Sequence, residues 1–299
     1  SWLPQFSSVI IPAVRHLDLS NRPWEDSYNT PAGANDPVED HQYLLYGTAM
    51  DDPGSADAAK HPPFQMTDLE SMMGPAASAP TSKTGHAMIL NEYGWLWLNR
   101  DGTPTLLTQK LYPRLLGDRN TTENRFALQA YLLGGETEFW RAYRRYAGVL
   151  EFVYLTASDP KGFTSDNFQN VQTLQLEPHF EKAMEEAFNP LGVYLNFWQP
   201  TLNTGEERDF TIAMVNDEDR ARSGTLRLVY TDAEGKEAEA GEAPFALEPL
   251  GAQSYLIPLK APAAAGKYSL KALATPDDDR GHPTVSRRDV ILQLSISKK

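Results

Sequence analysis

Residues 88–97 read Met-Ile-Leu-Asn-Glu-Tyr-Gly-Trp-Leu-Trp, and the interpretation of the whole sequence depends on this stretch. The apolar run followed by glycine predicts a buried strand over 87–93 that ends in a turn. Glu92 comes at the end of that strand, where a parallel α/β barrel places its active residues. The tryptophans that follow are suited to stacking on a sugar ring. Spacing alone also allows a plainer interpretation, in which Glu92 pairs with an arginine and the tryptophans belong to the core.

The first 190 residues show a repeating order of strand and helix around this stretch, which predicts an α/β domain. Three further apolar or aromatic segments are expected to form strands: 23–28, 41–46 and 148–155. Helices are expected over 7–17, 122–147 and 178–188. The Gly134-Gly135 pair is expected to split or kink the second helix. The long segment 48–85, with a short helical patch at 67–73, is interpreted as a surface excursion or as a loop over the substrate.

The hydrophobic pattern changes after Pro190. Apolar and polar residues alternate in segments such as 208–215 and 289–296, which is typical of half-buried antiparallel strands. About seven such strands with turn residues between them predict an immunoglobulin-like β-sandwich over 191–299. The expected fold class is therefore α/β plus all-β. Residues 1–190 would form the second half of a (β/α)8 TIM barrel, strands five to eight, and the sandwich would follow.

Composition and charge exclude several classes of function. The 299 residues are 41% hydrophobic and have a formal net charge of −13, which disfavours nucleic acid and anionic lipid as partners. No apolar run has the length of a membrane helix, so no membrane partner is expected. Cysteine is absent, which is compatible with an exported protein and with a cytoplasmic one.

Two motifs resemble glycoside hydrolase family 2, the β-galactosidase and β-glucuronidase family of clan A. Asn91-Glu92-Tyr93-Gly94 is similar to the nucleophile strand of that family, and residues 14–23 are similar to the junction before its fifth barrel strand. The resemblance implies a retaining β-glycosidase that hydrolyses O-glycosidic bonds of oligo- or polysaccharides. It implies Glu92 as the nucleophile, with Tyr93 bonding to it or orienting it, and it favours a secreted or periplasmic location.

The resemblance also implies a part that this sequence does not contain. The general acid/base of the family is a glutamate in an Asn-Glu pair that ends the fourth strand, and the only Asn-Glu here is Asn91-Glu92 itself. Half a barrel would also leave two open sheet edges. We therefore expect this sequence to be the carboxyl-terminal part of a larger protein. The rest of the barrel, an upstream segment or another chain, would be its partner and would supply the acid/base.

Substrate-binding residues are expected at the strand ends, because hydroxyl-rich ligands need hydrogen-bonding groups and aromatic surfaces. The candidates are Asn29, His41, Tyr43, Tyr93, Trp95 and Trp97. His41 fits a structural role equally well. Because neighbouring positions of a strand face opposite sides, either Tyr43 or Tyr46 is expected to face the helix layer.

No cofactor and no metal ion are expected, because the histidines are well separated and no phosphate-binding or zinc motif occurs. The acidic cluster Asp36, Glu39 and Asp40 is a rival to Glu92, but we interpret it as a solvated loop. The Asp277–Asp279 run suits a calcium ion or a solvated acidic turn, and the turn is preferred.

Two classes of function remain in competition. The first is a glycoside hydrolase with Glu92 as nucleophile. The second is a non-catalytic carbohydrate-binding or scaffold protein, built on a degenerate barrel and a β-sandwich. A preceding strand that ends in Asn-Glu would favour the enzyme. Neither the sugar nor exo or endo action can be predicted from these residues.

Overall fold

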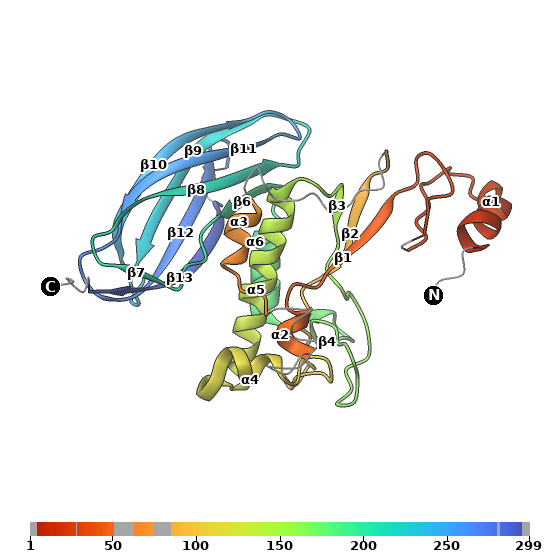
Figure 1. The fold of residues 1–299 in the computed structure, drawn as a ribbon. Helices are drawn as coiled ribbons and strands as arrows, with labels where there is room; N and C mark the ends of the chain where they lie inside the picture. Colours follow the sequence, from red (N-terminus) through yellow and green to blue (C-terminus); the bar gives the residue numbers. More distant parts are fainter. Residues whose placement is uncertain (1–4, 28, 51–62, 74–84, 280–281, 295–299) are drawn as a thin grey trace. The chain divides into compact units, whose positions relative to one another are not determined.

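The computed structural model describes residues 5–27, 29–50, 63–73, 85–279 and 282–294 (Figure 1). The chain divides into two compact units, each made of several segments. The first unit comprises Ser1–Phe64, Ser78–Gln129 and Tyr143–Glu177. The second unit comprises Gln65–Ala77, Ala130–Ala142 and Pro178–Lys299. One long helix, α5 (Thr122–Tyr143), contributes residues to both.

A short parallel sheet organises the first unit. Its strands are β1 (Val38–Gln42), β2 (Met88–Tyr93) and β3 (Gly148–Val149), in the order β1-β2-β3. Leu90, in the middle of β2, is fully buried. The register pairs His41 of β1 with Glu92 of β2. The sheet therefore brings the carboxyl ends of two strands, and the candidate residues on them, to one edge.

The other elements of the first unit are short. Helical turns are η1 (Phe6–Ile10), α1 (Ile11–Val14), η2 (Arg15–Leu17), α2 (Tyr46–Met50), α4 (Leu111–Leu116) and η3 (Gly117–Arg119). A two-stranded hairpin consists of β4 (Phe168–Asn170) and β5 (Gln175–Leu176). Asp36 fastens the amino-terminal segment. Its carboxylate pairs with Arg15 and accepts the backbone N–H groups of Trp24 (2.9 Å) and Gly33 (2.7 Å).

The predicted fold class is wrong in its barrel part: the described residues of 1–190 do not form half of a TIM barrel. The structure is 24% helical and 34% strand, whereas a (β/α) repeat contains more helix than strand. Among the described residues, 23–27 form no strand of a sheet, 43–46 lie beyond the end of β1, and β3 ends at Val149. A short apolar segment without a paired neighbour does not form a strand, and apolarity alone did not reveal which segments pair. The inference of a missing barrel half depended on those four strands and no longer holds.

Two sheets of long strands dominate the second unit (Figure 1). One has the order β10-β9-β12-β13-β7 and the other the order β11-β8-β6. Their bounds are β6 (Leu191–Leu195), β7 (Thr201–Asn203), β8 (Glu207–Asn216), β9 (Arg222–Thr231), β10 (Glu237–Leu247), β11 (Ala252–Lys260), β12 (Gly266–Pro276) and β13 (Thr284–Gln293). Neighbours are antiparallel except β13 and β7, which run parallel.

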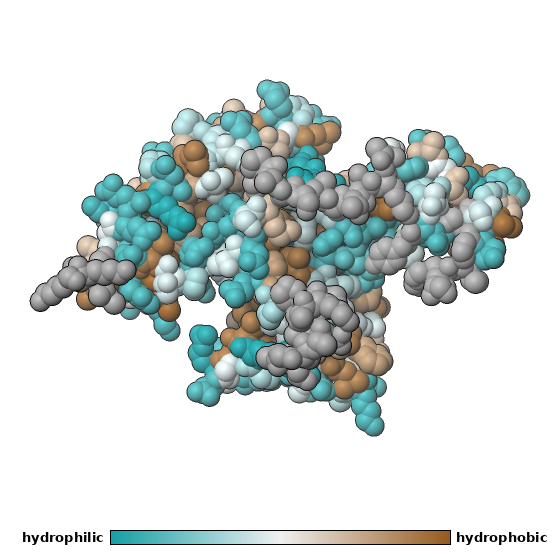
Figure 2. Space-filling view, in the orientation of Figure 1, coloured by the Kyte–Doolittle hydropathy of each residue, from teal (hydrophilic) through white to brown (hydrophobic). Residues whose placement is uncertain are grey.

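The core of the second unit lies between these sheets. Alternate residues of strands from both sheets, such as Phe210, Ile212 and Leu228, bury their side chains in one apolar cluster. The visible outer surface is mainly hydrophilic, with small separate apolar patches (Figure 2). Burial of one face per strand is the expected result of the period-two pattern. The two sheets therefore stabilise one another by packing face to face.

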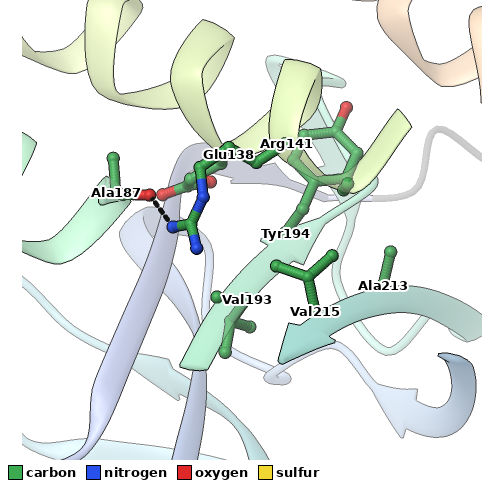
Figure 3. Close-up of a pocket in the computed structure, with 9 residues that line it drawn as sticks. Glu138, Arg141, Ala187, Val193, Tyr194, Ala213 and Val215 are labelled. Carbon is green, nitrogen blue, oxygen red and sulfur yellow. Dashed lines mark hydrogen bonds between the residues drawn. The ribbon is translucent and has the colours of Figure 1, made fainter. Parts of the chain in front are cut away.

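Helices α3 (Asp68–Met72), α6 (Pro178–Ala187) and the second part of α5 complete this unit. Figure 3 shows α5 above β6 and β8, where Glu138 and Arg141 approach Tyr194 and Val215. Arg141 donates to the carbonyl oxygen of Ala187, at the end of α6, and pairs with Asp217 at 2.8 Å. Charged groups of α5 thus connect it to α6 and to the end of β8.

The pair Gly134-Gly135 neither splits nor kinks α5, which runs unbroken from Thr122 to Tyr143. A Cβ atom at Gly135 would lie 2.3 Å from Cη2 of Trp198. Trp198 has little freedom to move, because its indole N–H donates to the Tyr194 hydroxyl (3.1 Å) and Arg288 stacks 3.9 Å from its ring centroid. Glycine at 135 therefore serves close packing.

We expect Gly135→Ala to lower the free energy of unfolding by about 1–3 kcal/mol, the usual cost of overpacking a core. Gly134→Ala is the matched control, because its Cβ would lie 3.3 Å from Cβ of Ala183 and alanine favours a helix by up to about 1 kcal/mol. Urea denaturation of both variants measures the difference. Equal stability of the two would contradict the role assigned to Trp198.

Glu136 is fully buried in α5, and neither of its carboxyl oxygens has a hydrogen-bond partner among the described residues. Burial raises its pKa well above the ordinary 4.5. As pH rises above 4.5, the unfolded chain releases this proton first, so stability falls by about 1.4 kcal/mol per pH unit until the folded pKa is reached.

Glu136→Gln should reduce the pH dependence of stability by about 1.4 kcal/mol per pH unit, because glutamine does not titrate. Chemical denaturation of wild type and variant from pH 5 upward checks it. Glu123→Gln, at an exposed position in the first turn of the same helix, is the control and should keep the slope. An unchanged slope in Glu136→Gln would show that another group is responsible.

Candidate functional site

Glu92 is the penultimate residue of β2, and its half-buried carboxylate faces His41 of β1 and Tyr43 just after that strand. The Tyr43 hydroxyl donates a hydrogen bond to Oε2 of Glu92. Nδ1 of His41 lies 3.5 Å from the same oxygen. All contacts of the Glu92 carboxylate found among the described residues reach Oε2, so Oε1 is the oxygen available to a ligand.

A second glutamate lies on the other side of His41. Oε2 of Glu39 is 3.4 Å from Nε2 of His41 and accepts a hydrogen bond from the side-chain amide of Asn91 (2.6 Å). Glu39 is only 6% exposed. His41 therefore lies between two carboxylates, and we refer to Glu39, His41, Tyr43, Asn91 and Glu92 as the Glu92 cluster.

Burial and charge shift the pKa of Glu92 in opposite directions. Burial raises it above the ordinary value, His41 acts to lower it, and the negative charge of Glu39 raises it further. The net direction is upward. At mildly acidic pH, Glu92 therefore holds its proton more firmly than a glutamate in water does, and at higher pH it is a carboxylate in a partly dry environment.

Two tryptophans lie beside the cluster. The ring centroid of Trp95 lies 4.8 Å from the ring centroid of Tyr43 and 4.9 Å from that of Trp97. Their indole N–H groups donate to the carbonyl oxygens of Leu107 (3.0 Å) and Phe152 (2.9 Å). Trp97 is buried, whereas Trp95 is partly exposed. Trp95 is thus the indole that can offer a face to a ligand.

The backbone at Trp95 is unusual. Gly94 and Trp95 both have positive φ, 99° and 78°. Positive φ is easy for glycine but strained for a bulky residue, and such strain is concentrated at functional sites. The turn after β2 therefore holds the Trp95 ring against Tyr43 at a cost in backbone energy.

The structure brings together His41, Tyr43, Glu92, Trp95 and Trp97 of the sequence-predicted site. The hydroxyl that the structure shows bonded to Glu92 belongs to Tyr43, and Tyr93 is buried. Asn29 donates to Asp26 at 3.2 Å, within a turn of its own segment. Tyr46 begins α2 and its ring lies 5.0 Å from Trp95.

The acidic residues Asp36, before β1, and Glu39 and Asp40, within it, have different roles. Asp36 binds Arg15 and backbone N–H groups of the amino-terminal segment. Asp40 accepts a hydrogen bond from the Tyr146 hydroxyl at 2.6 Å. Only Glu39 belongs to the Glu92 cluster. Strand alternation could have separated Glu39 from Asp40, but the sequence does not reveal that Glu39 contacts His41.

Two other carboxyl groups of the first unit retain a proton to higher pH than usual. Burial, and then repulsion by Glu39, raises the pKa of Glu25 to about 6. Burial raises the pKa of Glu151, just beyond β3, to about 7, although Asn167 donates to it at 3.3 Å. Sequence reasoning missed both groups, because an isolated glutamate has no pattern that reveals its burial.

No family model and no curated protein matches the sequence. Among solved structures, a β-glucosidase from Listeria innocua aligns with 36% of this chain and 17% of its own, at 12% identity and a TM-score of 0.28. The C-terminal domain of Wzt aligns with 33% of this chain and 66% of its own, at 14% identity and a TM-score of 0.27. Spo0M from Bacillus subtilis aligns with 35% and 49%, at 12% identity and a TM-score of 0.25.

This chain thus spans less than a fifth of the length of the β-glucosidase, and similarity of this degree identifies neither a family nor an activity. Within the part of the chain that the structure describes, none of the helices combines the length and the apolar character of a membrane span. Over the same residues, no group of three or more histidine and acidic side chains is placed to hold a metal ion.

Proposed function

We propose that the protein is a glycoside hydrolase of the retaining type, similar to family 2, with Glu92 as its nucleophile. The observation that supports this most strongly is the arrangement of the Glu92 carboxylate. Tyr43 and His41 hold Oε2, Oε1 is available to a ligand, and the Trp95 ring lies beside the same tyrosine. A carboxylate fixed by one oxygen beside an aromatic surface suits attack on a sugar carbon.

The reaction would proceed in two displacements. Oε1 of Glu92 attacks the anomeric carbon, the bond to the leaving oxygen breaks, and a proton donor neutralises that oxygen. The residue that donated this proton then takes one from water, which attacks the anomeric carbon of the glycosyl-enzyme from the opposite direction and returns Glu92 to its carboxylate form. In family 2 this proton donor and acceptor is a second glutamate.

The environment of Glu92 favours the second displacement. A hydrogen bond from Tyr43 stabilises the carboxylate as it leaves the ester, and His41 adds to this effect when it is protonated. Trp95 would stack on the apolar face of the sugar. Trp97 would hold the Trp95 ring in position, because the two indole rings are in contact. The substrate is therefore proposed to be an oligo- or polysaccharide.

Covalent trapping tests the proposal. Activated 2-fluoro glycosides stop the reaction at the glycosyl-enzyme ester, so a peptide that contains Glu92 should gain the mass of the fluorosugar. Glu92→Gln should show no such adduct. An adduct on a different glutamate, or none with gluco-, galacto-, manno- and glucurono-configured reagents, would overturn the assignment.

The pH profile offers a second test, independent of trapping. Activity that needs ionised Glu92 falls as pH drops through its raised pKa, so the acidic limb of kcat/KM should lie above the ordinary 4.5 of glutamate. Glu39→Gln removes the charge that raises this pKa, so the limb should move to lower pH. A limb that moves upward, or does not move, would contradict the coupling between these glutamates.

A non-catalytic carbohydrate-binding protein is the second candidate. The observation in its favour is that Glu39, the carboxylate adjoining the cluster, is already bonded to Asn91 and lies against His41. Trp95 would then bind sugar with no chemistry at Glu92. Oligosaccharide binding that is lost in Trp95→Ala, together with no adduct from any 2-fluoro reagent, would favour this candidate.

A further inference from the structure

A separate cavity of about 530 Å³ lies at one end of the second unit, where three connections meet. It is lined by Asn189, Pro190 and Leu191 where β6 begins, by Glu218, Arg220 and Arg222 where β9 begins, and by Asp278 and Asp279 after β12. Its volume is within the range of small-molecule sites, about 300–1,000 Å³. All lining residues belong to one unit, so the cavity is complete within it.

The connection between β8 and β9 is held rigidly by Asn216. This residue is fully buried, and its side-chain amide donates to the carbonyl oxygens of Arg220 (2.7 Å) and Glu248 (2.9 Å). Its side-chain oxygen accepts the backbone N–H of Glu218 (3.2 Å). The cavity wall is thus formed before any ligand arrives, which lowers the entropic cost of binding.

Two arginines and two carboxylates form a closed ring of ion pairs along the wall. Arg220 lies 3.4 Å from Glu218 and 3.2 Å from Asp278. Arg222 lies 2.5 Å from Glu218 and 3.3 Å from Asp278. The four charges of the ring cancel, and Asp279 adds one negative charge to the lining, so the wall offers fixed donors and acceptors with little net charge.

One donor of this ring has no partner. The Arg222 side chain is only 9% exposed, and its Nε–H is buried with no hydrogen-bond acceptor among the described residues. An unsatisfied buried donor costs about 1–3 kcal/mol. This donor is closed to solvent in this structure, so a ligand oxygen reaches it only after the Arg222 side chain shifts.

We propose that this cavity binds a neutral, hydroxyl-rich ligand, a sugar unit of an oligosaccharide. Hydroxyl groups donate to the carboxylates and accept from the guanidinium groups at the same time, which matches the alternating charges of the ring. A free anion would have to displace Glu218 and Asp278 from the arginines, and a cation would have to displace the arginines from the same carboxylates.

Titration of the full-length protein with neutral tetrasaccharides, followed by backbone amide NMR, tests the proposal. The probes are cellotetraose, laminaritetraose and mannotetraose, at concentrations up to about 10 mM. At least one should produce saturable shifts in amides 217–223 and 277–279. Arg220→Ala and Asp278→Asn should each weaken that binding by about tenfold, the equivalent of one hydrogen bond.

Arg227→Ala is the matched control, because Arg227 is an arginine of β9 that pairs with Glu237 outside the cavity. It should leave the affinity unchanged. Three results would overturn the proposal: no saturable shift with any tetrasaccharide, shifts confined to residues around Glu92, or saturation of the cavity amides by inorganic phosphate instead. None of these results depends on whether Glu92 is catalytic.

Discussion

Glu92→Gln should lower kcat on an activated aryl glycoside by at least about 1,000-fold, as expected when a nucleophile is removed. Glutamine keeps the size of the side chain and can still accept a hydrogen bond from Tyr43, so the cluster should remain folded. The amide oxygen is too weak a nucleophile to form a glycosyl ester. Steady-state kinetics and a thermal melt of both proteins measure these expectations.

Two further variants separate chemistry from packing. Tyr43→Phe retains the ring contact with Trp95 and removes the hydroxyl, so we expect a fall in kcat of about 10- to 100-fold. Glu181→Gln, on α6 of the other unit, is the control and should leave kcat unchanged. Wild-type turnover by Glu92→Gln would refute the proposed role of Glu92.

Glu138→Ala should lower the free energy of unfolding by about 3–5 kcal/mol, because it leaves a buried arginine without its counter-ion. Arg288 is 2% exposed and donates to Oε2 of Glu138 at 2.9 Å, and Ser286 donates to the same oxygen at 2.6 Å. An arginine remains charged at all accessible pH values, so it cannot escape the cost of burial by losing a proton.

The reciprocal variant should behave differently. Burial raises the pKa of Glu138, and Arg288 opposes that shift. In Arg288→Met the positive charge that lowers the pKa of Glu138 is removed, so Glu138 takes up a proton and becomes neutral. The variant should therefore be less destabilised than Glu138→Ala, and its stability should fall as pH rises. The control is Glu237→Ala, which removes an exposed pair with Arg227 and should cost less than about 1 kcal/mol. Urea denaturation at two pH values measures all three, and equal costs for the buried and exposed pairs would contradict this account.

Local patterns predicted strand positions better than they predicted how strands pair. Phe210, Ile212 and Met214 alternate in the sequence and are all buried on β8, because the period of a strand determines which residues face the core. The expected strand over 23–28 did not form in the described part of that segment, because strand formation requires a neighbour, which the segment does not specify. A barrel inferred from four apolar segments was therefore unsafe.

The same limit applies to the candidate site. Glu92 could be selected as a candidate from its position after an apolar run. Trp95 and Trp97 follow it within the same stretch, residues 88–97. The pairing of His41 with Glu92 depends on a register shift between Asp40 and His41, where β2 contains one extra residue, Asn91. Such an irregularity reverses which residues share a face, and no periodic pattern reveals it.

The position of Glu138 affects any attempt to shorten the protein. The sequence changes character at Pro190, and residues 191–299 read as an independent piece. Yet Arg288 and Ser286 on β13 depend on a carboxylate that the chain supplies 150 residues earlier, from the middle of α5. A truncated protein that begins at residue 191 would place an unneutralised guanidinium in its interior. A soluble version of the two sheets therefore needs α5 supplied with it, or Arg288 replaced by an apolar residue.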